Sequence, residues 1–241
     1  MTQIVCHRGA RLNAPENTFS SAAKALELGG AIIELDIRQS SDGVLYVMHD
    51  KTVDRTTDGT GQISEMASAE IDGLDAGSWF DERYTGERVP KLKDYLSSFA
   101  DRAGFYLEIK KADCSKVAEL VADLDIEDRC FTFSFDPEMR RQMLQFAPEM
   151  QRMIHWTTAG SAQKAIEQHK ASIVEFHDHD FDPGNIASCQ EAGLKVMFYT
   201  DHNDQKRFAQ ALALSMDFVN IDNLIEFDRL RQAFAAEQKL S

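Results

Sequence analysis

The feature that most constrains the fold is a regular alternation of short apolar runs with amphipathic stretches, almost from end to end. The apolar runs lack strict polar alternation, which is typical of strands buried on both faces of a parallel sheet. The stretches between them have apolar residues at three- and four-residue spacing, as Phe19, Ala22 and Leu26 illustrate. Strands separated by helices predict a parallel sheet covered by helices. The expected strands are 4–6, 31–37, 44–48, 105–109, 130–133, 152–155, 172–176, 195–199 and 217–221. The first expected helix begins at Phe19, and the later ones cover about 115–125, 137–146, 161–169, 185–192, 203–214 and the end of the chain.

The nine apolar runs are one more than an eight-stranded barrel needs, and the second and third runs explain the surplus. Only residues 39–43 separate them, which is too short for a crossover helix and suits a turn at Asp42-Gly43. The third run is therefore expected to fold back antiparallel on the second. A hairpin centred between Asp42 and Gly43 places His49 opposite Asp36. The remaining eight strands predict an α/β fold, a (β/α)₈ TIM barrel, as a single domain over residues 1–241.

One segment departs from the alternation. Residues 51–89 are rich in Thr, Gly, Asp and Ser, and they contain only isolated large apolar residues such as Ile63 and Trp79. A long irregular segment inside a barrel domain is usually functional. Because this one follows His49 directly, we expect a small insertion after the second barrel strand that forms a lid over the site to which His49 belongs.

The overall charge restricts the possible partners. A formal net charge of −14 repels phosphate backbones and anionic lipid, so neither nucleic acid nor a stable membrane association is expected. The four cysteines are scattered without a Cys-x-x-Cys pair, which favours buried thiols over a disulfide framework. The chain reaches His7 without an apolar signal-peptide region, and no apolar run approaches the ~18–20 residues that span a bilayer. We therefore expect a cytoplasmic protein.

The chemistry is expected at the C-terminal ends of the barrel strands, where the active sites of such barrels lie. Glu34 and Asp36 are two residues apart on the second strand, so their side chains share one face. The same spacing places Glu108 and Lys110 together on the third barrel strand. If these faces point inward, three carboxylates converge in a small volume.

Three converging carboxylates stay ionised only if a cation compensates their charge. Ligation by oxygen alone suits a hard divalent cation, Mg²⁺ or Ca²⁺. His7, after the first strand, and His49 can share the roles of general base and general acid. Arg8 and Lys110 supply the local positive charge that the chain lacks overall. Together these groups indicate an enzyme that acts on a phosphate ester.

Other candidate residues are expected to have supporting roles. Residues 177–180 read His-Asp-His-Asp, and their His-x-His spacing alone would suggest an amidohydrolase-like zinc barrel. The alternative is a polar loop, which is favoured because such a zinc site normally opens at the first strand and needs further His and Asp ligands at the later strand ends. His155 is expected in the pocket wall or the core. Glu16 is expected to orient Arg8, and Asn17 to cap the first helix.

Taken together, these residues resemble the glycerophosphodiester phosphodiesterase family. The resemblance is dense over residues 4–110 and looser afterwards, and it rests on the order and spacing of several motifs. Those motifs are His7-Arg8-Gly9, Pro15-Glu16-Asn17-Thr18, Glu34-Leu35-Asp36, Asp42-Gly43, Met48-His49-Asp50, residues 54–61, residues 74–80, Val89-Pro90-Lys91-Leu92 and Leu107-Glu108-Ile109-Lys110.

The resemblance implies that a glycerophosphodiester, a small molecule such as glycerophosphocholine, is cleaved to sn-glycerol 3-phosphate and an alcohol with one divalent cation as cofactor. The oligomeric state is not predicted. Carried over to this sequence, the family's site implies the catalytic residues His7 and His49, the metal ligands Glu34, Asp36 and Glu108, and the phosphate-binding residues Arg8 and Lys110.

The expected mechanism uses the glycerol hydroxyl of the substrate, which has a large effective-molarity advantage over water. It attacks phosphorus to form a cyclic phosphate, with His7 as first base and His49 as first acid, and water then opens the ring. The reverse order of the histidines and direct attack by water are the alternatives. A lyase that stops at the cyclic phosphate and a non-catalytic binder of phosphate ligands are two further readings. The chain has Tyr199 where relatives usually have Trp, and we expect Tyr199 and Trp79 to line the substrate pocket.

Overall fold

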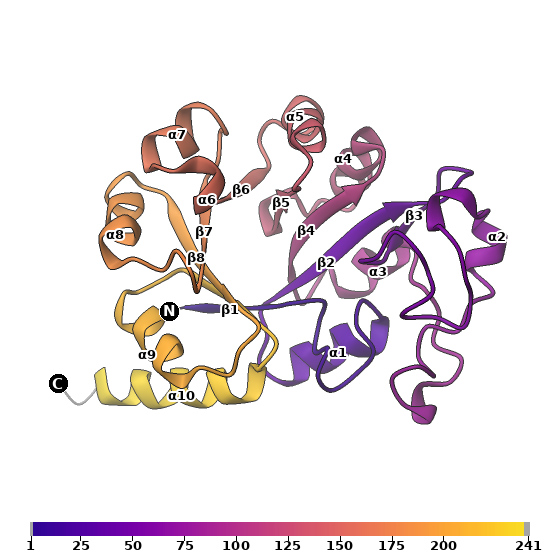
Figure 1. Cartoon of the computed structure of the whole chain (residues 1–241), viewed down its shortest axis with the longest axis horizontal. Coiled ribbons are helices and arrows are strands. Elements are labelled where there is room, and N and C mark those ends of the chain that lie inside the picture. Colours follow the sequence, from indigo (N-terminus) through magenta and orange to yellow (C-terminus); the bar gives the residue numbers. More distant parts are fainter. Residues whose placement is uncertain (1, 239–241) are drawn as a thin grey trace.

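The computed structural model describes residues 2–238, and within this range eight parallel strands close into a barrel (Figure 1). The hydrogen-bonded order is β1-β9-β8-β7-β6-β5-β4-β2, and pairing of β1 with β2 completes the ring. The predicted (β/α)₈ barrel is confirmed. The barrel strands are β1 (Gln3–Cys6), β2 (Ile32–Gln39), β4 (Gly104–Lys111), β5 (Cys130–Phe133), β6 (Gln151–His155), β7 (Ile173–His177), β8 (Lys195–Thr200) and β9 (Phe218–Ile221).

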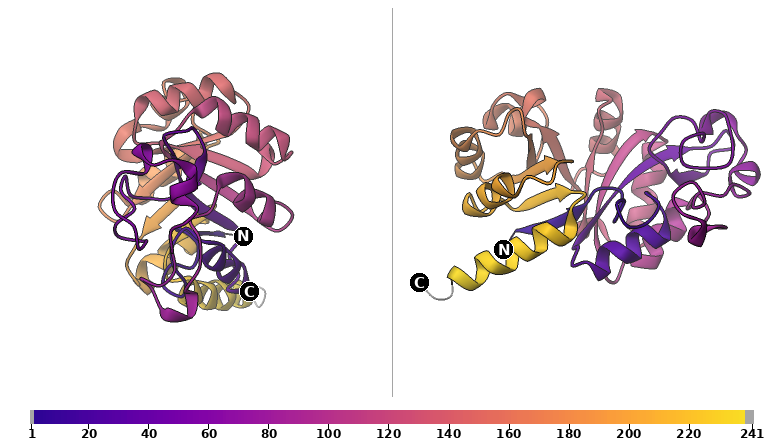
Figure 2. Two further views of the ribbon diagram at one scale, coloured as in Figure 1. Left: turned by 90° about the vertical axis from the view of Figure 1, so that its right-hand side faces the viewer. Right: turned by 60° about the horizontal axis from the view of Figure 1, so that its bottom comes forward.

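Helices cover the outside of the barrel (Figure 1). The predicted helices are present, and the structure adds α3, whose buried residues Tyr95, Leu96 and Phe99 have helical spacing. In Figure 2, α10 runs beside the N-terminal strand β1. The helices are α1 (Phe19–Glu27), α2 (Ser68–Ile71), α3 (Leu92–Phe99), α4 (Cys114–Asp123), α5 (Pro137–Phe146), α6 (Trp156–Ala159), α7 (Ala162–Glu167), α8 (Pro183–Glu191), α9 (Gln205–Ala213) and α10 (Leu224–Gln238), with 3₁₀ turns η1 (Ile63–Glu65), η2 (Glu82–Tyr84) and η3 (Glu127–Arg129).

The start of α1 differs from the prediction. The cap is Thr18, which accepts a hydrogen bond from the backbone N–H of Ser21, and it is not Asn17. Asn17 has a left-handed backbone with a φ of 57°, and its side-chain amide donates to Asp36 Oδ2 at 2.8 Å. The loop before α1 therefore directs Asn17 into the barrel mouth, so the residue is unavailable for capping.

The short strand β3 (Leu45–Val47) pairs antiparallel with β2, as predicted, but its register is shifted by one residue. Met48, and not His49, lies opposite Asp36, since the backbone N–H of Met48 donates to the Asp36 carbonyl. The cause is a three-residue loop between Ser40 and Val44, which hydrogen bond to each other, with Gly43 at a φ of 84°. The prediction had assumed a two-residue turn.

The apolar core continues from the barrel interior to the surrounding helices. Tyr106, Phe131 and Phe218 pack in succession inside the barrel, with ring centroids 4.8 and 5.7 Å apart. The insertion has a separate small cluster that includes Tyr46, Val53 and Ile63. All four cysteines are free and buried, which confirms the prediction of buried thiols. No helix in the described part of the chain is both long and apolar enough to cross a bilayer.

Candidate active site at the barrel mouth

Strand register brings the predicted acidic residues together. Asp36 on β2 is the direct partner of Glu108 on β4, and Glu34 is the partner of Tyr106. Side chains two residues apart share a strand face, so both strands present carboxylates to one end of the barrel interior. A pocket of about 180 Å³ opens there. Its lining includes six of the seven predicted catalytic, metal-ligating and phosphate-binding residues, namely His7, Arg8, Glu34, His49, Glu108 and Lys110.

Asp36 lies below this lining and is fully buried. Arg8 Nε and Lys110 Nζ approach its carboxylate at 3.5 and 3.2 Å, and Lys110 also pairs with Glu108. Burial alone would favour the neutral acid, but these two cations hold the pKa of Asp36 below its usual value. Asp36 is therefore ionised at neutral pH.

The other two carboxylates behave in the opposite way. Burial raises the pKa of Glu34 well above its usual value, and the charges of Asp36 and Glu108 raise it further. Burial and the charge of Asp36 also raise the pKa of Glu108, although Lys110 opposes them. The protein alone therefore lacks enough positive charge to keep all three carboxylates ionised at low cost.

The three carboxylates fit a divalent cation. One oxygen from each of Glu34, Asp36 and Glu108 lies within 4.8 Å of the others. Glu34 Oε1 is buried and has no hydrogen-bond partner in residues 2–238, whereas its Oε2 accepts from the Arg8 backbone N–H at 2.7 Å. A buried carboxylate oxygen without a partner is costly unless a cation or water meets it. These oxygen donors suit a hard cation such as Mg²⁺ or Ca²⁺.

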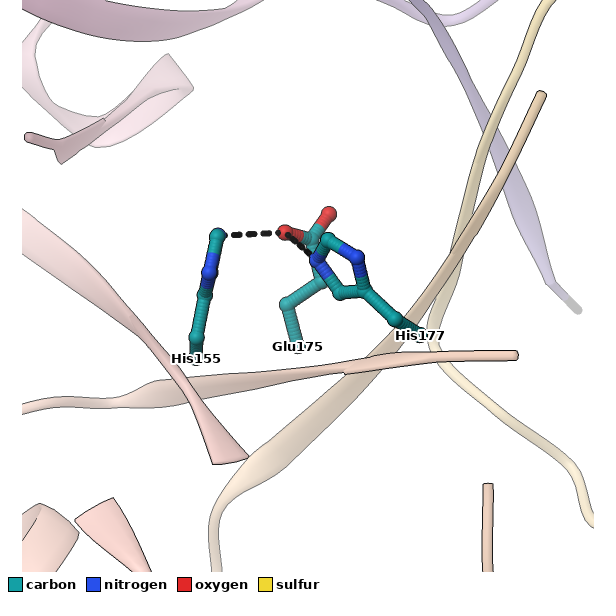
Figure 3. Close-up of side chains that lie close together, drawn as sticks. All are labelled: His155, Glu175 and His177. Carbon is teal, nitrogen blue, oxygen red and sulfur yellow. Dashed lines mark ion pairs between the residues drawn. The ribbon is translucent and has the colours of Figure 1, made fainter. Parts of the chain in front are cut away.

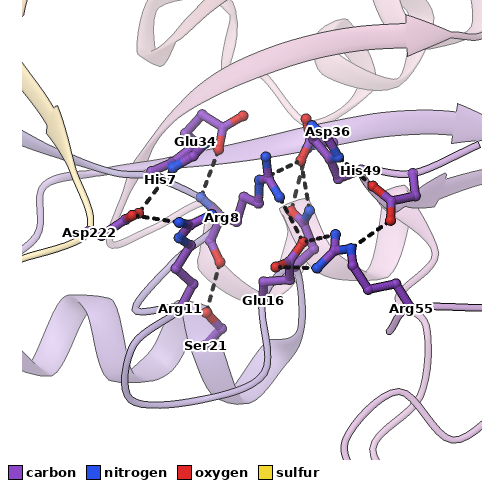
Figure 4. A network of polar contacts seen from close by, with 12 residues as sticks. His7, Arg8, Arg11, Glu16, Ser21, Glu34, Asp36, His49, Arg55 and Asp222 are labelled. Atoms are coloured by element: carbon purple, nitrogen blue, oxygen red, sulfur yellow. Dashed lines mark hydrogen bonds and ion pairs between the residues drawn. The ribbon is translucent and has the colours of Figure 1, made fainter. Parts of the chain in front are cut away.

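His7 is held by a residue from the opposite end of the chain. Its Nδ1 lies 3.0 Å from Asp222 Oδ1, just beyond β9, and Arg11 Nη2 lies 2.8 Å from Asp222 Oδ2 (Figure 4). The Asp222 carboxylate favours the tautomer with a proton on Nδ1, which leaves Nε2 free to accept a proton. Sequence alone did not show that Asp222 orients His7, because 215 residues separate the two.

His49 is oriented in the same way by its neighbour. Its Nδ1 lies 2.7 Å from Asp50 Oδ1, and Asp50 Oδ2 accepts from Arg55 Nε at 2.6 Å. Arg55 also contacts both oxygens of Glu16, which in turn accepts from Arg8 Nη1 at 2.9 Å. Burial lowers the pKa of His49, although Asp36 opposes this effect. Arg55 of the insertion is therefore linked to Arg8 through Glu16 and to His49 through Asp50.

The loop after β1 has a backbone that only certain residues tolerate. Arg8 and Gly9 both have positive φ, 57° and 79°, which turns the Arg8 N–H toward Glu34. A Cβ on Gly9 would lie 2.3 Å from Ser21 Oγ, and that hydroxyl donates to the Arg8 carbonyl at 2.8 Å. The close approach to Ser21 thus makes glycine necessary at position 9.

The opposite wall of the pocket comes from β6 to β9. Tyr199 lines it, with its ring centroid 5.1 Å from that of His7. His155 and His177 also line it, and Glu175, which sequence reasoning missed, lies between them. A glutamate inside the apolar run 172–176 was the available signal.

Trp79 is not brought to this pocket. It is 39% exposed, its Nε1 donates to the Ala76 carbonyl within its own turn, and its ring packs edge-on against Phe80. Local contacts within the insertion therefore hold the indole away from the residues that line the barrel mouth.

Comparisons with known proteins agree on one family. A model described as the glycerophosphoryl diester phosphodiesterase family matches residues 7–226. A glycerophosphodiester phosphodiesterase of Caldanaerobacter subterraneus is 31% identical over 210 residues, covering 83% of this chain and 85% of that protein. The crystal structure of a glycerophosphodiester phosphodiesterase from Agrobacterium tumefaciens is 46% identical, with a TM-score of 0.92 over 94% of this chain and 99% of that one. An Oleispira antarctica phosphodiesterase, solved in complex with the product sn-glycerol-3-phosphate, is 27% identical, with a TM-score of 0.83 over 96% and 97% of the two chains.

Proposed function

The chain belongs to the glycerophosphoryl diester phosphodiesterase family, and on that basis we propose that it hydrolyses glycerophosphodiesters to sn-glycerol 3-phosphate and an alcohol. The observation that carries this proposal is the convergence of Glu34, Asp36 and Glu108 at a pocket that His7 and His49 line. The Oleispira antarctica phosphodiesterase, solved in complex with the product sn-glycerol-3-phosphate, supports the same assignment.

We propose that Glu34, Asp36 and Glu108 hold one divalent cation, Mg²⁺ or Ca²⁺. The partnerless oxygen of Glu34 and the raised pKa values of Glu34 and Glu108 support this ligand set. When bound, the cation would offset negative charge on the phosphate oxygens and lower the pKa of the attacking hydroxyl. Arg8 and Lys110, whose charged groups lie against Asp36, would bind the remaining phosphate oxygens.

The two histidines are assigned to proton transfer. His7, with Nδ1 fixed by Asp222, takes the proton of the substrate's glycerol hydroxyl at Nε2 as this hydroxyl attacks phosphorus. His49, whose Nδ1 is hydrogen bonded to Asp50, donates a proton to the leaving alcohol. Its side chain is 31% exposed against 11% for His7, which suits a group on the side where the alcohol leaves. Water then opens the cyclic phosphate with the roles reversed.

Protonation of His49 depends on the bound substrate. Burial lowers the pKa of His49 in the free site, so the imidazole is mostly neutral there at pH 7. The phosphodiester brings a negative charge to the same pocket, and a nearby negative charge raises a histidine pKa. We therefore assign the acid role to His49 in the substrate complex.

The insertion over residues 51–89 is proposed to be a lid of the same single domain. Its Arg55 contacts Glu16 and Asp50 at the barrel mouth, which supports a role in shaping the site. Because the segment lies beyond the ends of β2 and β3 (Figure 1), it borders the side from which a head group would project.

The test of the function is release of sn-glycerol 3-phosphate from a panel of glycerophosphodiesters, with and without EDTA. We expect release that stops with EDTA and returns with Mg²⁺ or Ca²⁺. A substrate analogue without the 2-hydroxyl separates the two mechanisms, because it cannot form the five-membered cyclic phosphate. Normal turnover of this analogue would instead indicate direct attack by water, and no release from any member of the panel would contradict the function itself.

A further inference from the structure

A second cluster of metal-ligating side chains lies on the wall of the pocket opposite the carboxylates. Glu175 Oε2 lies 3.0 Å from His155 Nε2 and 3.4 Å from His177 Nε2, and the centroids of the two imidazole rings are 4.7 Å apart (Figure 3). His155 and Glu175 are direct partners across β6 and β7, and His177 ends β7 on the same face as Glu175. The three polar tips therefore converge because of strand register, and no loop rearrangement is needed.

Hydrogen bonds within the described chain do not satisfy every buried polar atom of this cluster. Glu175 is 2% exposed, and its Oε1 already accepts from Asn220 Nδ2 at 3.3 Å. The contact from His177 to Oε2 lacks hydrogen-bond geometry, so His177 Nε2 is a buried atom without a hydrogen-bond partner in the described chain. A buried polar atom without a partner is costly, and this one faces the same oxygen as His155 Nε2.

We propose that His155, Glu175 and His177 form a second cation site, selective for a borderline divalent metal such as Zn²⁺ or Co²⁺. Tetrahedral ligands at about 2.0–2.1 Å from zinc lie roughly 3.3 Å from one another. The separations of 3.0 and 3.4 Å lie on either side of that value. Two imidazole nitrogens and one carboxylate favour such a metal over Mg²⁺ or Ca²⁺, which prefer oxygen ligands like those of the first site.

The ligands are already oriented by a surrounding shell of contacts. Asn220 fixes the rotation of the Glu175 carboxylate, and the ring of Phe133 stacks on His155 with centroids 4.3 Å apart. The backbone N–H of His177 donates to Asp180 Oδ1 at 2.5 Å. Outer contacts of this kind orient first-shell ligands and increase metal affinity.

Three protein ligands leave at least one coordination position open. All three residues line the pocket that also holds Glu34 and Glu108, so this position would face the same space. The ligand class that completes the coordination is an oxygen donor, either water or a phosphate or hydroxyl oxygen of a bound molecule. The proposal depends only on the geometry of β6 and β7, and it stands independently of the reaction assigned to the first site.

The test is a metal titration that keeps the two sites apart. The full chain is stripped with EDTA, transferred to excess Mg²⁺ to occupy the carboxylate site, and titrated with Zn²⁺ by calorimetry and with Co²⁺ by visible absorption. We expect one equivalent to bind per chain, with the intense visible bands of four- or five-coordinate Co²⁺. His177→Ala and Glu175→Gln should weaken binding at least about 100-fold, since they remove ligands.

Two variants serve as matched controls. His179→Ala removes the other histidine of the His-x-His run, which is largely exposed, and Glu108→Gln alters the first site only. Both should retain the Zn²⁺ and Co²⁺ equivalent. If Glu175→Gln fails to fold by circular dichroism, the half-buried His177→Ala decides. The proposal is overturned if no saturable binding occurs in excess Mg²⁺, if the His177 variant binds as wild type does, or if binding is lost in a control.

Discussion

At the scale of single residues, the site is built from buried acids whose pKa values diverge. Asp36 is kept ionised by Arg8 and Lys110, whereas burial and repulsion raise the pKa of Glu34. Perturbed groups of this kind cluster at functional sites. The divergence follows from the positions of Arg8 and Lys110, whose charged groups lie against the Asp36 carboxylate, so each acid can be tested separately.

The first prediction concerns Glu34→Gln in the metal-free enzyme. A carboxyl whose folded-state pKa exceeds 4.5 binds more protons folded than unfolded, so stability falls as pH rises from 4.5 through the raised pKa. The variant should lack this loss, so its free energy of unfolding should exceed that of wild type by about 1–3 kcal/mol at pH 8 and match it at pH 4. Urea unfolding in EDTA measures the difference, with Glu127→Gln as the exposed control. If wild type and Glu34→Gln have equal free energies of unfolding at pH 8 as well as at pH 4, the proposed buried charge at Glu34 is refuted.

The second prediction separates the roles of His7 and His49. His49→Ala should lower kcat/KM about 10²–10⁴-fold for a choline diester, since its alcohol needs a proton to leave. A p-nitrophenol leaving group needs none, so the variant should lose much less with that substrate. His7→Ala should be equally impaired with both. The two variants are compared by initial rates with both substrates. If His7→Ala, and not His49→Ala, is rescued by the p-nitrophenol leaving group, then His7 is the acid and His49 is the base.

At the scale of elements, short turns set the positions of the site residues. The three-residue loop at Gly43 shifts β3 by one residue, so His49 reaches the site from beyond the strand end, and strand alternation does not direct it there. The sequence Ser-Ser-Asp-Gly is compatible with both loop lengths, which is why the register could not be predicted.

The third prediction tests the loop after β1. Gly9→Ala would place a methyl group 2.3 Å from Ser21 Oγ at a φ of 79°, so both contact and backbone oppose it. We expect a loss of about 2–4 kcal/mol in the free energy of unfolding, together with lower activity. Gly160→Ala is the control, because its φ is 67° but no atom lies within 4 Å of the added carbon. It should cost only about 1 kcal/mol. Equal costs would show that the contact with Ser21 is unimportant.

The fourth prediction concerns the connection between the insertion and the barrel. Arg55→Ala removes the bridge between Glu16 and Asp50, so the two carboxylates that orient Arg8 and His49 each lose a partner. Activity should fall about 10–100-fold, because small misplacements of catalytic groups are costly. The head-group preference should change as well. Arg83→Ala is the control, because this exposed side chain of the insertion contacts Asp81 and the Tyr84 ring and should behave as wild type when removed. An unchanged substrate profile in the Arg55 variant would argue against a lid.

At the scale of the whole molecule, barrel closure determines which residues meet. The alternation of strands and helices was sufficient to predict the eightfold count, and the spacing of Glu34 with Asp36 and of Glu108 with Lys110 predicted a shared face. Contacts made through closure were not predictable in the same way. Asp222 reaches His7 because β9 pairs with β1, and Glu175 reaches His155 because β7 pairs with β6.

The fifth prediction is that cation binding stabilises the whole domain. A ligand at 100 times its dissociation constant adds about 2.7 kcal/mol, which for a chain of this size raises Tm by roughly 5–10 °C. Mg²⁺ should produce this shift in wild type, measured by differential scanning calorimetry. Glu108→Gln should lose most of it because a ligand is removed. A shift that is the same in both proteins would mean that the ion binds elsewhere.

The most direct test is anomalous diffraction from a crystal grown with Mn²⁺, as a substitute for Mg²⁺, and sn-glycerol 3-phosphate. We expect a peak about 2.0–2.3 Å from carboxylate oxygens of Glu34, Asp36 and Glu108. The phosphate should lie between His7 and His49. A crystal that binds Mn²⁺ without a peak at these three carboxylates, or that holds the phosphate away from both imidazoles, would contradict this arrangement.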